Sequence, residues 1–86
     1  MVRDFLITNE QGIHARPATA LVQKANEFQS DITITYNGMT TDLKSIMGVL
    51  SLGVTKGSNI TLRIEGEDEV EALKQITSFI TKLNLQ

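Results

Sequence analysis

The 86 residues of this chain are 41% hydrophobic and 21% charged, an ordinary composition for one globular domain over residues 1–86. The formal net charge of −2 argues against direct nucleic-acid binding, and the absence of cysteine excludes a disulfide framework, thiol catalysis and a zinc ribbon. No segment is apolar for long enough to cross a membrane and the first residues lack the apolar run of a signal peptide, so we expect a cytoplasmic protein that is not inserted in a membrane.

The chain begins with a predicted strand and a predicted helix. VRDFLIT, residues 2–8, is rich in residues that favour strands, although Phe5, Leu6 and Ile7 interrupt a clean alternation. Between residues 15 and 28, apolar residues recur at helical spacing and predict a helix with one buried stripe. The stripe consists of Ala18, Leu21, Val22, Ala25 and Phe28.

A hairpin and a short helix follow. In DITITYNGMTTDL, residues 31–43, alternation places Ile32, Ile34 and Tyr36 on one face of a strand. The dipeptide Asn37-Gly38 is the strongest short signal for a hairpin, because both turn positions need positive φ. SIMGVLSLG, residues 45–53, predicts a short apolar helix that ends at its final glycine.

The last part of the chain predicts a strand and a long helix. NITLRIEG, residues 59–66, points Ile60, Leu62 and Ile64 inward and the residues between them outward. Asp68 and Glu71 resemble a capping box that opens the helix. One apolar face of this helix consists of Val70, Leu73, Ile76, Ile80 and Leu83. The order of elements predicts an α+β fold, in which helices cover one face of a four-stranded sheet.

GIHARPATAL, residues 12–21, holds the only histidine and the only proline of the chain. Gly12 can turn the chain sharply into the helix, which places His14 at or next to the N-cap. Pro17 fits the first turn, because the N–H that proline lacks would have no intrahelical partner there.

This helix start has the features of an anion-binding site. The N–H groups of Ala15, Arg16 and Ala18 are expected to be free and to point out of the positive end of the helix. The Arg16 guanidinium suits bidentate contact with phosphate. The same positive field disfavours the imidazolium and keeps His14 neutral, hence nucleophilic, near pH 7. A neutral imidazole beside a phosphate cradle can accept a phosphoryl group on nitrogen and pass it on.

The spacing alone also fits a plainer interpretation. His14 could be a surface residue near the cap, Arg16 could be solvated, and Pro17 could serve only to start the helix. A metal site is disfavoured, because one histidine without cysteine supplies one good nitrogen ligand. A hydrolase triad is disfavoured too, because nothing specifies a carboxylate that would orient His14.

GIHARPATAL and LKSIMGVLSLG, residues 43–53, together resemble the HPr family, the histidine-containing phosphocarrier proteins of the bacterial phosphoenolpyruvate:sugar phosphotransferase system. The resemblance runs the full length of the chain and implies an open-faced β-sandwich, with the strands ordered 1-4-2-3 and three helices on one side. It implies that His14 accepts phosphate from Enzyme I on Nδ1 and donates it to sugar-specific IIA proteins, with Arg16 and Pro17 as companions. Catalysis then belongs to the partners, so we expect a carrier rather than an enzyme, with no cofactor and no metal.

Ser45 is predicted to be the N-cap of the short helix. In the Gram-positive HPr branch, the matching serine is phosphorylated by HPr kinase/phosphorylase, and the product is a corepressor for the catabolite control protein, a LacI-type repressor. A dianion suits a helix N-terminus, so this modification should not unfold the protein. Periodicity alone predicts that Ile46, Met47 and Leu50 are core residues, whereas the family exposes much of this patch as a docking surface for Enzyme I and IIA. The flexible thioether of Met47 suits such a surface best.

Two alternatives stay open. GEDEVEALKQITSFITKLNLQ, residues 66–86, resembles Crh, the paralogue that keeps the serine and replaces the histidine with glutamine. His14 favours the phosphocarrier, while a mainly regulatory corepressor acting through phosphorylated Ser45 is the alternative. We expect a monomer, and the likeness to Crh adds a dimer with exchanged N-terminal strands as a second form. A prosthetic-group serine, as in acyl carrier proteins, fits poorly, because those domains are all-helical and carry Asp where Lys44 stands.

Overall fold

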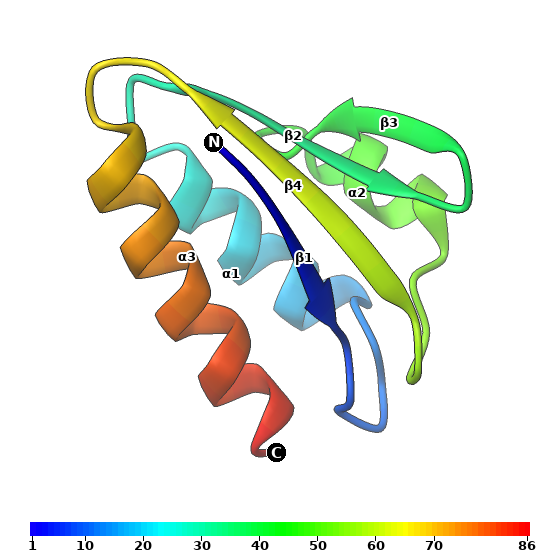
Figure 1. Ribbon diagram of the computed structural model, residues 1–86. Coiled ribbons are helices and arrows are strands. Elements are labelled where there is room, and N and C mark those ends of the chain that lie inside the picture. The colour runs from blue at the N-terminus through cyan, green and yellow to red at the C-terminus, as the bar shows by residue number, and fades with distance from the viewer.

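The computed structural model describes residues 1–86 and contains four strands and three helices. In chain order these are β1 (Val2–Leu6), α1 (Ala15–Ala25), β2 (Asp31–Tyr36), β3 (Met39–Asp42), α2 (Ile46–Leu52), β4 (Asn59–Glu65) and α3 (Glu69–Asn84). The strands form one antiparallel sheet in the order β1-β4-β2-β3, and the helices lie on one side of it (Figure 1). The predicted α+β open-faced sandwich is confirmed, as is the strand order.

The hydrophobic core lies between the helices and the inner face of the sheet. Alternate residues of β2 and β4 reach this core and are almost completely buried: Ile32, Ile34, Ile60, Leu62 and Ile64. The outer face is polar, because the strand register places Thr35 between Thr40 of β3 and Thr61 of β4. Such alternation is typical of an antiparallel sheet that is covered on one face only.

The hairpin between β2 and β3 is the turn that the sequence predicts. Asn37 has φ 53° and Gly38 has φ 80°, so both central residues of the two-residue turn adopt the left-handed conformation. Asparagine and glycine tolerate this conformation better than other residues.

Helix α1 is three residues shorter than the sequence pattern predicts. It ends at Ala25, and Phe28 is buried beyond the helix end. The Asn26 side chain explains this end, because its amide donates to the carbonyls of Val22, at 2.9 Å, and Lys44, at 3.2 Å. These bonds tie the end of α1 to the residue that precedes Ser45.

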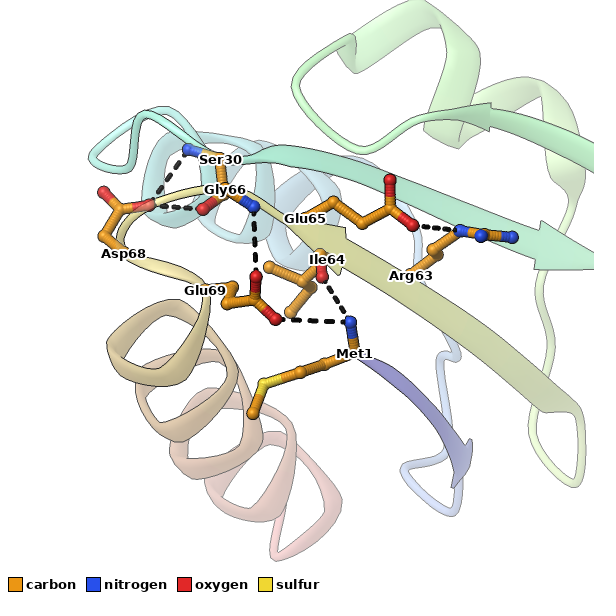
Figure 2. Close-up of polar contacts among 8 residues, drawn as sticks. All are labelled: Met1, Ser30, Arg63, Ile64, Glu65, Gly66, Asp68 and Glu69. Carbon is orange, nitrogen blue, oxygen red and sulfur yellow. Dashed lines mark hydrogen bonds and ion pairs between the residues drawn. The ribbon is translucent and has the colours of Figure 1, made fainter.

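The predicted capping box at the start of α3 is wrong. Asp68 is the N-cap residue, but its carboxylate makes no cap bond. It accepts hydrogen bonds from the N–H of Ser30 at 2.9 Å and from the Ser30 hydroxyl (Figure 2). It also accepts one from the N–H of Gln29 at 2.8 Å. These donors, the Ser30 hydroxyl first, lower the pKa of Asp68 below its ordinary value. Asp68 therefore joins the start of α3 to the start of β2.

The buried face of α3 differs from the predicted one at its first turn. Val70 is 66% exposed, and Ala72 is buried in line with Ile76 and Ile80. Val70 lies two residues before Ala72, which is about 200° around the helix axis and therefore on the opposite side.

Strand β1 forms an edge of the sheet and pairs only with β4. At its first end, the terminal ammonium of Met1 donates to the carbonyl of Ile64 at 2.7 Å and lies 3.5 Å from the Glu69 carboxylate (Figure 2). At its other end, the side-chain amide of Asn84 accepts from the Thr8 N–H at 2.9 Å and donates to the Leu6 carbonyl at 2.8 Å. Asn84 thus occupies backbone groups that a further strand would use.

Candidate functional site

The approach to α1 is a tight turn that only glycine can make. Gly12 has φ +61°, and a Cβ atom there would lie 2.3 Å from the Val54 carbonyl oxygen and 2.7 Å from the Cα of Thr55. Two hydrogen bonds close the turn: the Gly12 N–H donates to the Asn9 carbonyl at 3.2 Å, and the Asn9 side-chain amide donates to the Gly12 carbonyl at 2.9 Å. The turn delivers His14 to the N-cap position of α1, as predicted.

His14 is exposed and its side chain makes no cap hydrogen bond. The N–H groups of Ala15 and Arg16 donate to no protein acceptor, as expected for the first residues of a helix. The prediction for Ala18 is wrong, because its N–H donates to the His14 carbonyl at 2.7 Å and the residue is buried. Ala18 lies four residues after the N-cap and so joins the regular helical pattern. Two open donors remain beside the imidazole.

Arg16 and Pro17 lie beside these donors. Pro17 is the third residue of α1, where its missing N–H leaves no helical bond unmade. The exposed Arg16 side chain makes no ion pair or hydrogen bond within the chain. Both residues line a hollow of about 370 Å³ between the start of α1 and the end of α3, which also contains Gln11 and Gln86. An anion bound at this helix start could therefore meet both open N–H groups and the guanidinium.

Helix α2 begins at a satisfied cap. Ser45 is its N-cap, and the Ser45 hydroxyl accepts from the Gly48 N–H at 3.1 Å, as predicted. The Lys44 ammonium donates to the Phe28 carbonyl at 2.8 Å and fixes the chain before Ser45. At Gly48, a Cβ atom would lie 2.3 Å from the Thr41 hydroxyl oxygen and 3.2 Å from the Ser45 hydroxyl oxygen, so glycine leaves room for both side chains. Helix α2 ends at Leu52, and the C-cap residue Gly53 has φ 67°.

Ile46, Met47 and Leu50 form an exposed apolar patch on α2, with exposed fractions of 41%, 77% and 37%. Val49 and Leu52 are the residues of this helix that are buried. The prediction from periodicity that the three patch residues belong to the core is wrong, because a helix on a sheet buries only one stripe. Their exposure agrees with what the resemblance to the HPr family implies.

An ion pair braces the approach to α1 and was not anticipated from the sequence. The Lys56 ammonium lies 2.7 Å from the Glu10 carboxylate, which joins the turn before α1 to the loop before β4. This hydrogen bond and the charge of Lys56 lower the pKa of Glu10. No local sequence signal pairs these two side chains. The role of Asn9 has a weak signal, because asparagine side chains often hydrogen-bond to the backbone of a nearby turn.

No group of three or more histidine, cysteine, aspartate or glutamate side chains is arranged to hold a metal ion. None of the helices has the length and apolar character needed to cross a membrane.

Comparison with known proteins relates this site to a family. A family model described as the PTS HPr component phosphorylation site matches residues 1–82. The chain is 38% identical to HPr-C-His from Thermoanaerobacter tengcongensis, covering 100% of this chain and 97% of that chain with a TM-score of 0.94.

Two other solved structures are dimers. A chain of an HPr dimer from Thermoanaerobacter tengcongensis is 42% identical, covering 91% of this chain and 90% of that chain with a TM-score of 0.77. Crh, the catabolite repression protein of Bacillus subtilis, is described as a dimer with a swapped domain. It is 43% identical, covering 90% of this chain and 88% of that chain with a TM-score of 0.76.

Proposed function

Because this chain belongs to the HPr family, the phosphocarrier components of the phosphotransferase system, we propose that His14 accepts a phosphoryl group from Enzyme I and passes it to sugar-specific IIA proteins. The observation that carries this proposal is the exposed His14 side chain at an uncapped helix N-terminus, with free donors beside it. The chain then acts as a cytoplasmic carrier whose partners perform the catalysis.

The chemistry follows from the groups at the start of α1. A lone pair on Nδ1 of His14 attacks phosphorus, and the bond from phosphorus to the donor breaks as the nitrogen–phosphorus bond forms. The N–H groups of Ala15 and Arg16 and the positive end of the helix attract the phosphoryl oxygens. The Arg16 guanidinium adds a full positive charge and a bidentate donor. The reverse sequence at a IIA protein discharges the carrier.

We further propose that HPr kinase/phosphorylase phosphorylates Ser45, and that the product binds the catabolite control repressor. Ser45 is partly exposed and directly precedes the apolar patch of Ile46, Met47 and Leu50, which we propose as the docking surface for Enzyme I and IIA. A phosphate on Ser45 would place about −1.5 to −2 charges beside that patch. Docking of an apolar partner surface would then require desolvation of a dianion.

The alternative function is that of a Crh-like corepressor, which acts mainly through phosphorylated Ser45. The identities of 38% to HPr and 43% to Crh are too similar to separate the two roles. The presence of His14 favours the carrier function, because Crh has glutamine in place of this histidine.

The deciding experiment is incubation of the protein with Enzyme I and phosphoenolpyruvate, followed by acid and base treatment of any bound phosphate. We expect wild type to acquire a phosphate that acid removes and base leaves in place, as phosphohistidine behaves. The His14→Ala protein should acquire none, and the Ser45→Ala protein should behave like wild type. A wild-type chain that acquires no phosphate, with an Enzyme I that phosphorylates another HPr, would support the corepressor instead.

As to assembly, we propose that the carrier works as a monomer and that exchange of β1 between two copies gives its dimer. In the monomer, β1 pairs with β4 of its own chain over the full length of the strand. The dimeric relatives, including the swapped Crh, support a second form in which β1 pairs with β4 of another copy.

A further inference from the structure

Strand exchange would preserve almost every contact of β1. The pairing of β1 with β4, the burial of Phe5 and the bonds of Asn84 to β1 would all form again with the second copy. Contacts that occur in both forms do not decide between them, because they contribute equally to each. The equilibrium therefore depends on the segment between Ile7 and Ile13, which folds back in the monomer and must extend in the dimer.

The folded-back segment contains two backbone features that only glycine accommodates and one buried polar atom without a partner. Gly12 adopts a left-handed φ of +61°. Its α-carbon lies so close to the backbone of Val54 that a Cβ atom would be only 2.3 Å from the carbonyl oxygen. The side-chain oxygen of Asn9, a residue that is 4% exposed, has no hydrogen-bond partner. Extension of the segment would remove the need for a left-handed residue 12 and would expose the Asn9 oxygen to water.

We propose that the Asn9–Gly12 turn is the switch between the monomer and a strand-exchanged dimer of this chain. The turn stays closed because residue 12 is glycine, and any side chain at this position drives the chain to exchange. This proposal rests on the assembly described under the proposed function and names the residues that control it. The turn ends two residues before His14, so the switch also sets the approach of the chain to the proposed phosphoryl acceptor.

A disulfide reporter can distinguish the two forms, because the chain contains no cysteine. Val2 and Arg63 are directly opposite each other on β1 and β4, and both side chains are exposed. They follow the doubly bonded pair of Met1 and Ile64, so they form a non-hydrogen-bonded pair with Cα atoms about 4.5 Å apart, within reach of a disulfide. Val2→Cys with Arg63→Cys should cross-link within one chain in the monomer and between chains in the exchanged dimer.

The experiment compares three backgrounds that carry this reporter: wild type, Gly12→Ala and Gly53→Ala. Gly53 is the matched control, since its φ of +67° resembles that of Gly12 but no atom lies within 4 Å of its Cβ position. Each protein is incubated reduced at high concentration, oxidised, and separated on a non-reducing gel. We expect Gly12→Ala to raise the ratio of interchain to intrachain disulfide at least tenfold over both other backgrounds. Size-exclusion chromatography of the cysteine-free variants should show the same order.

Equal ratios in Gly12→Ala and Gly53→Ala would overturn the proposal. Abundant interchain disulfide in all three backgrounds would overturn the role of the turn and uphold exchange itself, whereas none in any background would overturn both. Phosphate acceptance by His14 is measured separately, so these outcomes leave the carrier function intact.

A second variant addresses misfolding. Two glycines inserted after Gln11 in the Gly12→Ala protein lengthen the turn and should return it to a monomer, because the longer segment can close without the clash. A Gly12→Ala chain that is unfolded with and without this insertion would also overturn the proposal.

Discussion

The starts of α1 and α2 are built in opposite ways. At α2, the Ser45 hydroxyl accepts the N–H of Gly48 and satisfies the helix end. At α1, the His14 side chain accepts no hydrogen bond from the helix, and the N–H groups of Ala15 and Arg16 have no acceptor within the protein. A serine cap stabilises a helix by about 1 kcal/mol relative to an uncapped start. The first helix thus lacks a stabilising bond at the place where a phosphoryl oxygen can bind, whereas the second uses the hydroxyl that we propose as its regulatory site.

Replacement of His14 should give the largest effect. His14→Ala and His14→Ser should both abolish phosphate acceptance from Enzyme I, because the accepting nitrogen is gone. His14→Ala should change the free energy of unfolding by about 0.5 kcal/mol or less, since the side chain is exposed. His14→Ser should stabilise the protein by about 1 kcal/mol, because it gives α1 the cap that α2 already has. Urea unfolding and the phosphoenolpyruvate assay measure the two effects, and a His14→Ala chain that still accepts phosphate would exclude this assignment.

Arg16 tests whether the open helix start needs its guanidinium. Arg16→Ala should slow transfer from Enzyme I by about a hundredfold, as loss of a donor to a developing anion does in enzymes. Arg16→Lys should lie in between, because it keeps the charge and loses the bidentate geometry. Single-turnover transfer kinetics give these rates. Equal rates for wild type and both variants would show that Arg16 is a bystander.

Ser45 tests the satisfied helix start. Ser45→Asp keeps a capping acceptor and adds a charge beside Met47, so it should raise the carrier concentration needed for half-maximal phosphorylation by about tenfold, equivalent to about 1.4 kcal/mol. Ser45→Ala should leave transfer unchanged and lower the free energy of unfolding by about 1 kcal/mol, because the bond to Gly48 is lost. Transfer kinetics at several carrier concentrations, with urea unfolding, separate these effects. If Asp and Ala change transfer alike, or if Asp unfolds the protein, the docking account fails.

We expect the smallest effect at the start of α3, where the Asp68 carboxylate accepts hydrogen bonds from Gln29 and Ser30 and not from the helix itself. Its pKa in the folded protein is lowered, chiefly by the Ser30 hydroxyl and then by the Gln29 N–H. Its contribution to stability is therefore complete above about pH 4, the ordinary pKa of aspartate, and is lost as the pH falls through the lowered value. In the Asp68→Asn protein, the free energy of unfolding should decrease less steeply than in wild type as the pH is lowered through this acidic range.

Other acidic groups also contribute to this pH dependence and must be separated from Asp68. Arg63 lowers the pKa of Glu65, and Lys56 lowers the pKa of Glu10. The contributions of these two carboxylates to the stability of the fold are therefore also lost on acidification. The difference between wild type and Asp68→Asn isolates the Asp68 contribution, and Ser30→Ala should reduce that difference. Parallel pH profiles for wild type and Asp68→Asn would show that the bonds to Ser30 and Gln29 do not stabilise the fold.

Local sequence signals predicted most of the fold and the position of the site. The alternation of Ile60, Leu62 and Ile64, the turn at Asn37-Gly38 and the left-handed end at Gly53 are each decided by neighbouring residues. The same holds for the two helix starts, because Gly12 and Pro17 fix where α1 begins and the capping preference of serine fixes where α2 begins.

The errors arise where distant residues decide. Asp68 looks like a capping residue, but Ser30, which is 38 positions away in the sequence, binds its carboxylate. Helix α1 ends before Phe28 because Asn26 bonds to Lys44. On α2, apolar residues lie on every side of the helix, so the sequence pattern alone does not select the buried side. Packing against α1 and the sheet buries Val49 and leaves Met47 exposed.

The sheet order also determines when each part of the chain can fold. Strands β2 and β3 are joined by a two-residue turn and can pair as soon as both have left the ribosome, whereas β1 has no strand partner until β4 is synthesised. Contacts between residues as far apart as Val2 and Arg63 close a long loop and form slowly. Asn84, whose amide covers the free edge of β1, lies at the end of the last helix. Of the four strands, β1 is therefore the last to be secured, and it stays available to a neighbouring nascent chain until Asn84 has left the ribosome.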